Sequence, residues 1–186
     1  MTLDQIRHAD KNDSLINSFI DVVYSYVDSI QKSPKEYHKS LKGGLDMALR
    51  IITGSHVSFV SEKVLDYLSE NKIIVNPFDL IWEERHKMGH INLNNRKYSM
   101  AVWEHTIPIK EFRESLIKKN NKASVRETLF EYPGVAWISR EEDIKLSQIG
   151  YQTERPGGFL KCYDEAGIKL INEFTYKQII KLPNKT

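Results

Sequence analysis

The strongest candidate for chemistry in this chain is an acidic residue followed directly by a histidine, Glu104-His105, at the end of the apolar run 100–103. The run predicts a β-strand, and Pro108 three residues later predicts the first turn of a helix. A carboxylate binds a cation or carries a proton, and an imidazole exchanges its proton close to neutral pH. The pair therefore lies at a strand end with the groups that acid–base or metal chemistry needs.

Glu104-His105 with Pro108 resembles the first motif of the HNH, or His-Me finger, nucleases, in which an aliphatic-proline step follows the histidine. The resemblance implies that His105 is the general base that activates water and that Glu104 is a ligand of one divalent metal ion, Mg²⁺ or Mn²⁺. Such a metal polarises the scissile phosphate and offsets charge on the leaving oxygen.

This chain departs from the family pattern in two ways. No histidine follows His105, so Asn120 or Asn121 would have to replace the second histidine of the family, and a helix replaces the expected loop and strand. His90 is a further candidate ligand, because a hairpin would bring it near residues 103–105. An alternative has Glu104 and His105 on opposite faces of a strand, one exposed and one hydrogen-bonded in the core.

A cluster of basic residues follows the pair. Its members fall within nine positions: Lys118, Lys119, Lys122 and Arg126. Side chains of this kind neutralise phosphates of nucleic acids. The alternative is a solvated helix end, where the helix dipole favours lysine.

Two functions remain open. The first is a metal-dependent endonuclease of the restriction or mobile-element kind, acting on nucleic acid, with DNA as the expected substrate and a homodimer as a possible assembly. The second is a non-enzymatic module that binds nucleic acid or protein. In the second, Trp82, Trp103 and Trp137 belong to the core and the histidines are incidental.

Three other segments have weaker patterns. His86 and His90 are four apart, but Gly89 interrupts a helix there and the metalloprotease glutamate is missing. Asp143-Ile144-Lys145 has the letters of a PD-(D/E)xK nuclease, yet it follows a helix cap, where acids are favourable. Gly157-Gly158 lacks the Gly-Lys-Ser/Thr of a phosphate-binding loop, so a plain connecting loop is expected.

Composition sets the broad class. The 186 residues are 40% apolar and 28% charged, with 27 basic and 25 acidic residues, as in an ordinary globular protein. No apolar run approaches the roughly 20 residues of a membrane span, and the first residues lack the pattern of a signal peptide. The single cysteine, Cys162, excludes an internal disulfide, predicts a core position and favours a cytoplasmic location.

The periodicity of apolar residues predicts an α+β fold, with a helical region over 1–72 and an α+β region over 73–186 in one compact unit. The expected helices run from Ser14 to before Pro34, on to about Gly54, over 57–70, over 79–87, from Pro108, from Ser124 to about Tyr132, from the Ser139 capping box, and over 176–181. The expected strands are a hairpin of 89–93 with 97–104, the run 135–138, and a hairpin of 159–163 with 168–171.

Overall fold

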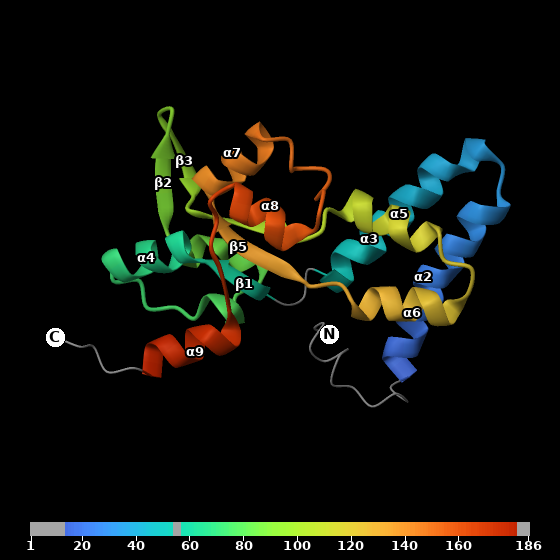
Figure 1. Ribbon diagram of the computed structural model, residues 1–186, viewed down its shortest axis with the longest axis horizontal. Helices are drawn as coiled ribbons and strands as arrows, with labels where there is room; N and C mark the ends of the chain where they lie inside the picture. Colours follow the sequence, from blue (N-terminus) through green and yellow to red (C-terminus); the bar gives the residue numbers. More distant parts are fainter. Residues whose placement is uncertain (1–13, 54–56, 182–186) are drawn as a thin grey trace.

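The computed structural model describes residues 14–53 and 57–181 and has the predicted α+β fold. Figure 1 shows two parts side by side, a group of helices and a sheet that is covered by further helices. Among the described residues, no helix has both the length and the apolar content that crossing a membrane requires.

Four helices form the first part: α2 (Ser14–Lys32), α3 (His38–Thr53), α5 (Ile109–Ile117) and α6 (Lys122–Phe130), with the turn η1 (Lys35–Tyr37) between the first two. Their apolar side chains recur every three or four residues and so face inward together. Fully buried members of this core include Val23, Val27, Leu45, Leu49, Leu116 and Val125.

A four-stranded sheet forms the second part, in the order β4 (Ala101–His105), β5 (Val135–Ser139), β1 (Val57–Ser61) and β6 (Leu170–Asn172). β1 runs parallel to β5, whereas β4 and β6 run antiparallel to their neighbours. Every residue of β5 is buried. The strand order places β4 at one edge of the sheet, and its last two residues are Glu104 and His105.

Three strands each end in a side chain that caps the next helix: Ser61 before α4 (Glu62–Glu70), Ser139 before α7 (Arg140–Gln148) and Asn172 before α9 (Glu173–Lys181). Glu142 joins two of these caps. Its Oε2 accepts hydrogen bonds from Ser61 Oγ at 2.6 Å and from the Ser139 backbone N–H at 2.7 Å. The parallel strands β1 and β5 thus end at one buried carboxylate.

The remaining elements surround the sheet. They are the turns η2 (Pro77–Asp79) and η3 (Trp82–Met88), the hairpin β2 (His90–Leu93) with β3 (Arg96–Ser99), and α8 (Phe159–Glu165). Asn94 and Asn95 both have positive φ, as a two-residue hairpin turn requires, so this hairpin was predictable.

The structure corrects five local predictions. Residues 57–61 are strand β1 and not the start of a helix, because this β-branched and aromatic run pairs with β5 on one side and β6 on the other. Residues 159–165 form helix α8, not a strand. Residues 97–104 do not form one strand, since β3 and β4 belong to different sheets.

The fourth and fifth corrections concern the start of α6 and the segment 79–87. The cap of α6 is Asn121, whose Oδ1 accepts from the Ser124 N–H at 2.9 Å, so the helix begins before Ser124. The segment 79–87 forms 3₁₀ turns in place of one α-helix.

Packing also crosses the predicted boundary at residue 72. β1, which precedes the boundary, is central in the sheet, while α5 and α6, which follow it, complete the helical part.

Gly43 and Gly44 in α3 provide a matched test of helix packing. A Cβ at Gly44 would lie 2.6 Å from Cε1 of Tyr26 on α2, whereas a Cβ at Gly43 would meet nothing within 4 Å. We expect Gly43→Ala to raise the free energy of unfolding by about 0.5–1 kcal/mol, because alanine is the better helix former. Gly44→Ala should give a lower value than Gly43→Ala in urea denaturation, and equal stabilisation by both would contradict this close crossing.

Candidate functional site

Glu104 and His105 leave opposite faces of β4. In the register with β5, Glu104 is opposite Ala136 and His105 is opposite Val135, and successive residues of a strand alternate between its faces. Thr106 then ends the strand, because both its backbone N–H and its Oγ1 donate to the carbonyl of Gly134. Because both residues lie at the end of β4, they nevertheless line one pocket of about 330 Å³.

Elements from both parts of the molecule form this pocket, which we call the Glu104–His105 pocket. Helix α3 contributes Asp46 and Arg50, helix α5 contributes Lys110, and the loop after α7 contributes Gln152 and Thr153. Pro108, which precedes the first residue of α5, also lies in its wall, so the predicted proline-started helix is confirmed and positions the site.

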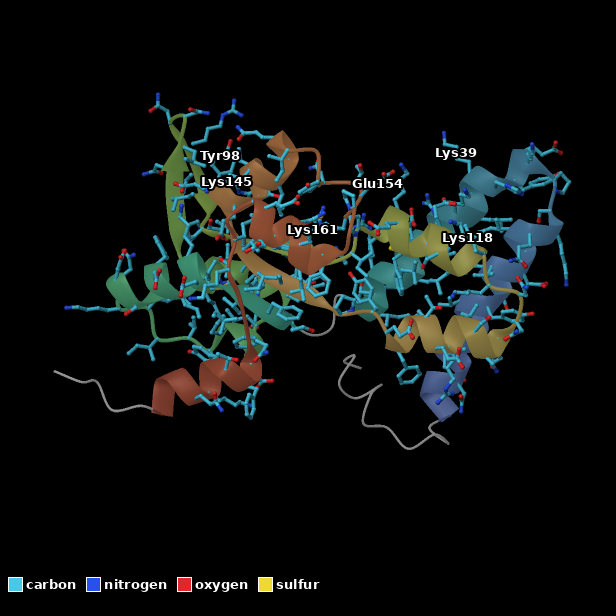
Figure 2. The ribbon with its side chains drawn as sticks, viewed as in Figure 1. Lys39, Tyr98, Lys118, Lys145, Glu154 and Lys161 are labelled. Carbon is cyan, nitrogen blue, oxygen red and sulfur yellow. The ribbon has the colours of Figure 1, made fainter. Side chains whose placement is uncertain are left out.

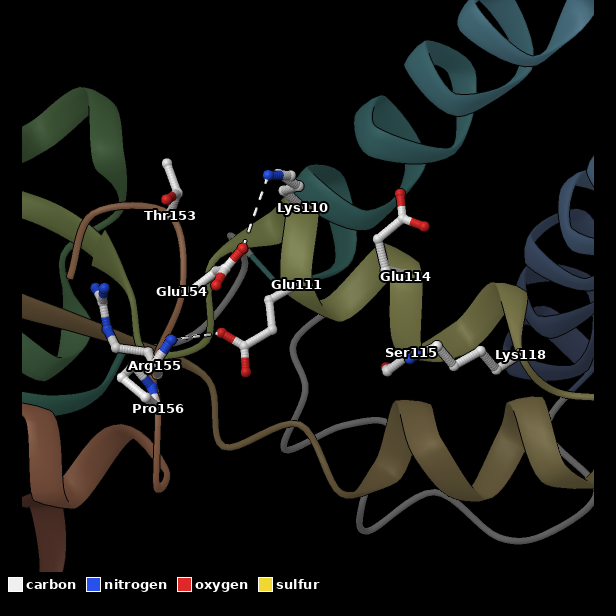
Figure 3. Close-up of a pocket in the computed structure, with 9 residues that line it drawn as sticks. All are labelled: Lys110, Glu111, Glu114, Ser115, Lys118, Thr153, Glu154, Arg155 and Pro156. Atoms are coloured by element: carbon white, nitrogen blue, oxygen red, sulfur yellow. Dashed lines mark hydrogen bonds and ion pairs between the residues drawn. The ribbon is translucent and has the colours of Figure 1, made fainter. Parts of the chain in front are cut away.

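Arg155 is the direct partner of Glu104. Its Nη2 donates to Oε1 of Glu104 at 2.5 Å, and its side chain has no solvent exposure while that of Glu104 is 19% exposed. The backbone N–H of Arg155 donates to Oε2 of Glu111 on α5 at 2.8 Å. Figure 3 shows this contact, together with that of Lys110 and Glu154, holding the loop 153–156 against α5.

Burial sets the charge of both candidate groups. It raises the pKa of Glu104 to about 7, since desolvation outweighs the attraction of the Arg155 charge. Burial, with a smaller repulsion from Arg50, lowers the pKa of His105 to about 4. Nε2 of His105 is buried and has no hydrogen-bond partner among the described residues. Near pH 7 the carboxyl group therefore exchanges a proton readily, whereas the imidazole is neutral.

A second pocket, of about 430 Å³, adjoins the first and shares Lys110 and Thr153 with it. It extends along α5 to Lys118 (Figure 3). Its charges are balanced, because Glu111, Glu114 and Glu154 also line it.

The structure divides the predicted basic cluster. Lys118 lies at the end of α5 and reaches the second pocket (Figure 2). Lys119 lines a different hollow, between α5 and α6. Lys122 pairs with Asp21 on α2, and Arg126 donates to Oδ1 of Asn17 at 2.8 Å. Lys122 and Arg126 therefore turn toward α2 and away from the Glu104–His105 pocket.

The predicted metal ligands are not brought together. Asn120 and Asn121 follow α5, whose nine residues separate them from Pro108 by about 13 Å at 1.5 Å per residue. Asn121 is occupied as the cap of α6, and His90 is exposed in β2. Across residues 14–53 and 57–181 there is no group of three His, Cys, Asp or Glu side chains that could hold a metal ion. This donor set does not fit the expected Mg²⁺ or Mn²⁺ site.

Several further expectations can be compared with the structure. Cys162 is buried, as predicted, and Asp143 lies in the first turn of α7 and not on a strand. Trp137 is a core residue, but Trp82 is 50% exposed, so its assignment to the core is wrong. Arg50 and Lys110 were missed, and Arg155 was assigned to a plain connecting loop. The only sequence signal for Arg155 was its position before Pro156-Gly157-Gly158, where a loop ends.

No family model, curated protein or solved structure matches this chain. The function is therefore inferred from the geometry of the site.

The two shifted pKa values predict opposite effects of pH on stability. Between pH 4.5 and about 7 the folded chain holds more protons at Glu104 than the unfolded chain, so this group makes the free energy of unfolding fall as pH rises. Between about pH 4 and 6.5 His105 has the reverse effect.

Single substitutions separate these contributions. The quantity to compare is the free energy of unfolding of each variant minus that of the wild type, over pH 4.5–6.5. This difference should rise with pH for Glu104→Gln and fall with pH for His105→Gln, in each case by at most about 1.4 kcal/mol per pH unit. Urea denaturation at several pH values measures both slopes. Profiles parallel to that of the wild type for both variants would show that neither pKa is shifted.

Proposed function

We propose that this protein is an endonuclease that cleaves phosphodiester bonds of nucleic acid in the Glu104–His105 pocket. The observation that carries the proposal is the buried Glu104 carboxyl group with a pKa of about 7, which lines a pocket together with the cations Arg50 and Lys110. A group that titrates at the working pH is the most effective proton carrier, and cations stabilise the charge on the phosphate in the transition state.

The two pKa values favour an assignment of roles different from that implied by the family resemblance. Glu104, as a carboxylate, takes a proton from the attacking water molecule while the new phosphorus–oxygen bond forms and the bond to the leaving oxygen breaks. The leaving oxygen is protonated from solvent. His105 is a weak base because its pKa is about 4, so its neutral imidazole serves as a hydrogen-bond partner of the phosphate or the nucleophile. Its unpaired Nε2 supports this role.

A specific observation supports a second candidate, a non-enzymatic binding module. The ion pair between Glu104 and the fully buried Arg155 also ties the loop after α7 to the edge of the sheet. Buried pairs of this kind serve structure as well as chemistry, because removing one partner leaves an uncompensated charge. In this candidate the pocket binds an anion and transforms nothing.

Glu104→Gln distinguishes the two candidates. We expect it to lower the rate of oligonucleotide cleavage by about 10²–10⁴-fold, since the amide cannot exchange a proton. The amide oxygen of the glutamine can still accept the hydrogen bond from Arg155. The matched control is Glu70→Gln, an equal change of charge at an exposed residue that ends α4 and does not line the Glu104–His105 pocket. Cleavage by Glu104→Gln at the rate of the control would overturn the catalytic role.

The assay also tests the metal. Single- and double-stranded DNA and RNA are incubated with the wild type in EDTA, Mg²⁺ or Mn²⁺. Because the predicted metal ligands do not come together, we expect cleavage in EDTA at a rate within about threefold of that in Mg²⁺. Loss of cleavage in EDTA would instead restore the metal-dependent mechanism, and no cleavage under any condition would favour the binding module.

A further inference from the structure

An apolar hollow adjoins the Glu104–His105 pocket on the side away from Lys118. It has a volume of about 610 Å³ and lies between α3 and η3. Its apolar lining comes from Met47, Ile51, Trp82 and Trp103, and we call it the Trp82–Trp103 pocket. Arg50, Trp103 and His105 line both pockets, so the two are continuous.

The surface around this hollow is unusually apolar for solvent-exposed positions. Met47 is 64% exposed, Ile51 is 66% exposed and Trp82 is 50% exposed. These side chains come from two separate elements, yet they face the same hollow. Covering them with a ligand would remove apolar area from water, which favours binding by roughly 25 cal/mol per Å². Clustered exposed apolar side chains of this kind mark binding surfaces.

Two indole rings in this pocket are held in place by their neighbours. Trp103 packs edge-on against the buried Trp137, with ring centroids 4.7 Å apart and planes at 80°. The guanidinium of Arg85 lies over the ring of Trp82 at 4.0 Å. A ring that is already fixed loses little freedom when a planar ligand stacks on it.

The Trp82–Trp103 pocket is lined by one acid, Glu83, and by one cation, Arg50, and of the two only Arg50 also lines the Glu104–His105 pocket. Arg50 stands where the two pockets join, beside His105, and it is exposed. A ligand that fills both pockets therefore combines a flat apolar part with an anionic part, as a nucleobase and its adjoining phosphate do. Aromatic side chains bind unstacked bases at about 1–3 kcal/mol per base. A base within a duplex is stacked between its neighbours and has no free face to offer.

We propose that the Trp82–Trp103 pocket binds one unstacked base of single-stranded nucleic acid and so places the neighbouring phosphodiester at Glu104 and His105. The inference deepens the proposed function and rests on it. It makes the substrate an unpaired strand, and it assigns Trp82 as a specificity residue that does not touch the reacting atoms.

The test measures binding, so that it does not depend on cleavage. Full-length Glu104→Gln protein is titrated with fluorescently labelled ten-nucleotide thymidine DNA, uridine RNA and a duplex of equal length at one fixed salt concentration, and anisotropy is recorded. We expect both single strands to bind at least tenfold more tightly than the duplex. Adding Trp82→Ala should weaken single-strand binding by about tenfold or more, and Trp82→Phe should restore most of it, because a phenyl ring also stacks.

Ile81→Ala, also added to Glu104→Gln, is the matched control. Ile81 adjoins Trp82, is 47% exposed and does not line the pocket, so its removal should leave binding unchanged. Equal single-strand binding by the Trp82→Ala and control proteins, or equal binding of duplex and single strand, would overturn the base pocket. A third result would also overturn the base pocket: the protein does not bind single strands but associates with itself, and Trp82→Ala abolishes this association. The occupant would then be a second copy of this chain.

Failure of the base pocket is distinguishable from failure of the proposed function. If the wild type cleaves no nucleic acid but binds single strands in a Trp82-dependent manner, the nuclease is wrong and the base pocket stands. If the wild type cleaves and Glu104→Gln does not, yet Trp82→Ala binds as the control does, the nuclease stands and the base pocket is wrong.

Discussion

The ion pair between Arg155 and Glu104 is the interaction on which the candidate site depends. A guanidinium without solvent exposure needs a compensating charge, and the partner of Arg155 lies on the edge strand of the sheet. The same residue binds Glu111 on α5 through its backbone, so one short loop joins the sheet to the helical part. This attachment keeps Gln152 and Thr153 in the wall of the Glu104–His105 pocket.

The pair also links stability to chemistry. Desolvation raises the pKa of Glu104 more than the Arg155 guanidinium lowers it, so the carboxyl group titrates near neutral pH and not in the acidic range. His105, one residue later but on the other face of β4, undergoes the opposite shift for the same reason. The edge of the sheet thus holds an acid that binds its proton unusually tightly beside a base that binds it unusually weakly. This difference in pKa favours Glu104 as the proton carrier and His105 as a neutral hydrogen-bond partner.

Features determined by neighbouring residues were predictable from the sequence. The capping box of Ser139 with Glu142, the helix that begins after Pro108 and the two-asparagine turn of the β2–β3 hairpin each depend on side chains within four positions. The strand that ends in Glu104 and His105 was likewise predicted, since it contains a continuous apolar run. Of the four predicted basic residues, Lys118 lines the second pocket, and the other three face elsewhere.

Features determined by distant residues were not predictable in this way. Val57, Val60 and Val64 satisfy helical spacing, and only pairing with β5 and β6 makes the first part of that run a strand. Arg155 is 51 positions from Glu104, so no local pattern reveals their contact. Nothing in the sequence distinguishes Trp82 from a core tryptophan. In the structure it is exposed and lines the hollow between η3 and α3.

The strand order has a consequence for how the chain is made. Both neighbours of β1 in the sheet, β5 and β6, lie later in the sequence. During synthesis from the N-terminus, β1 is therefore complete long before either partner exists, whereas α2 and α3 can pack as soon as residue 53 has emerged. The Glu104–His105 edge follows the same order, because β4 pairs only with β5 and Arg155 is made later still. The sheet, and with it the candidate site, therefore cannot form until the last third of the chain has been made.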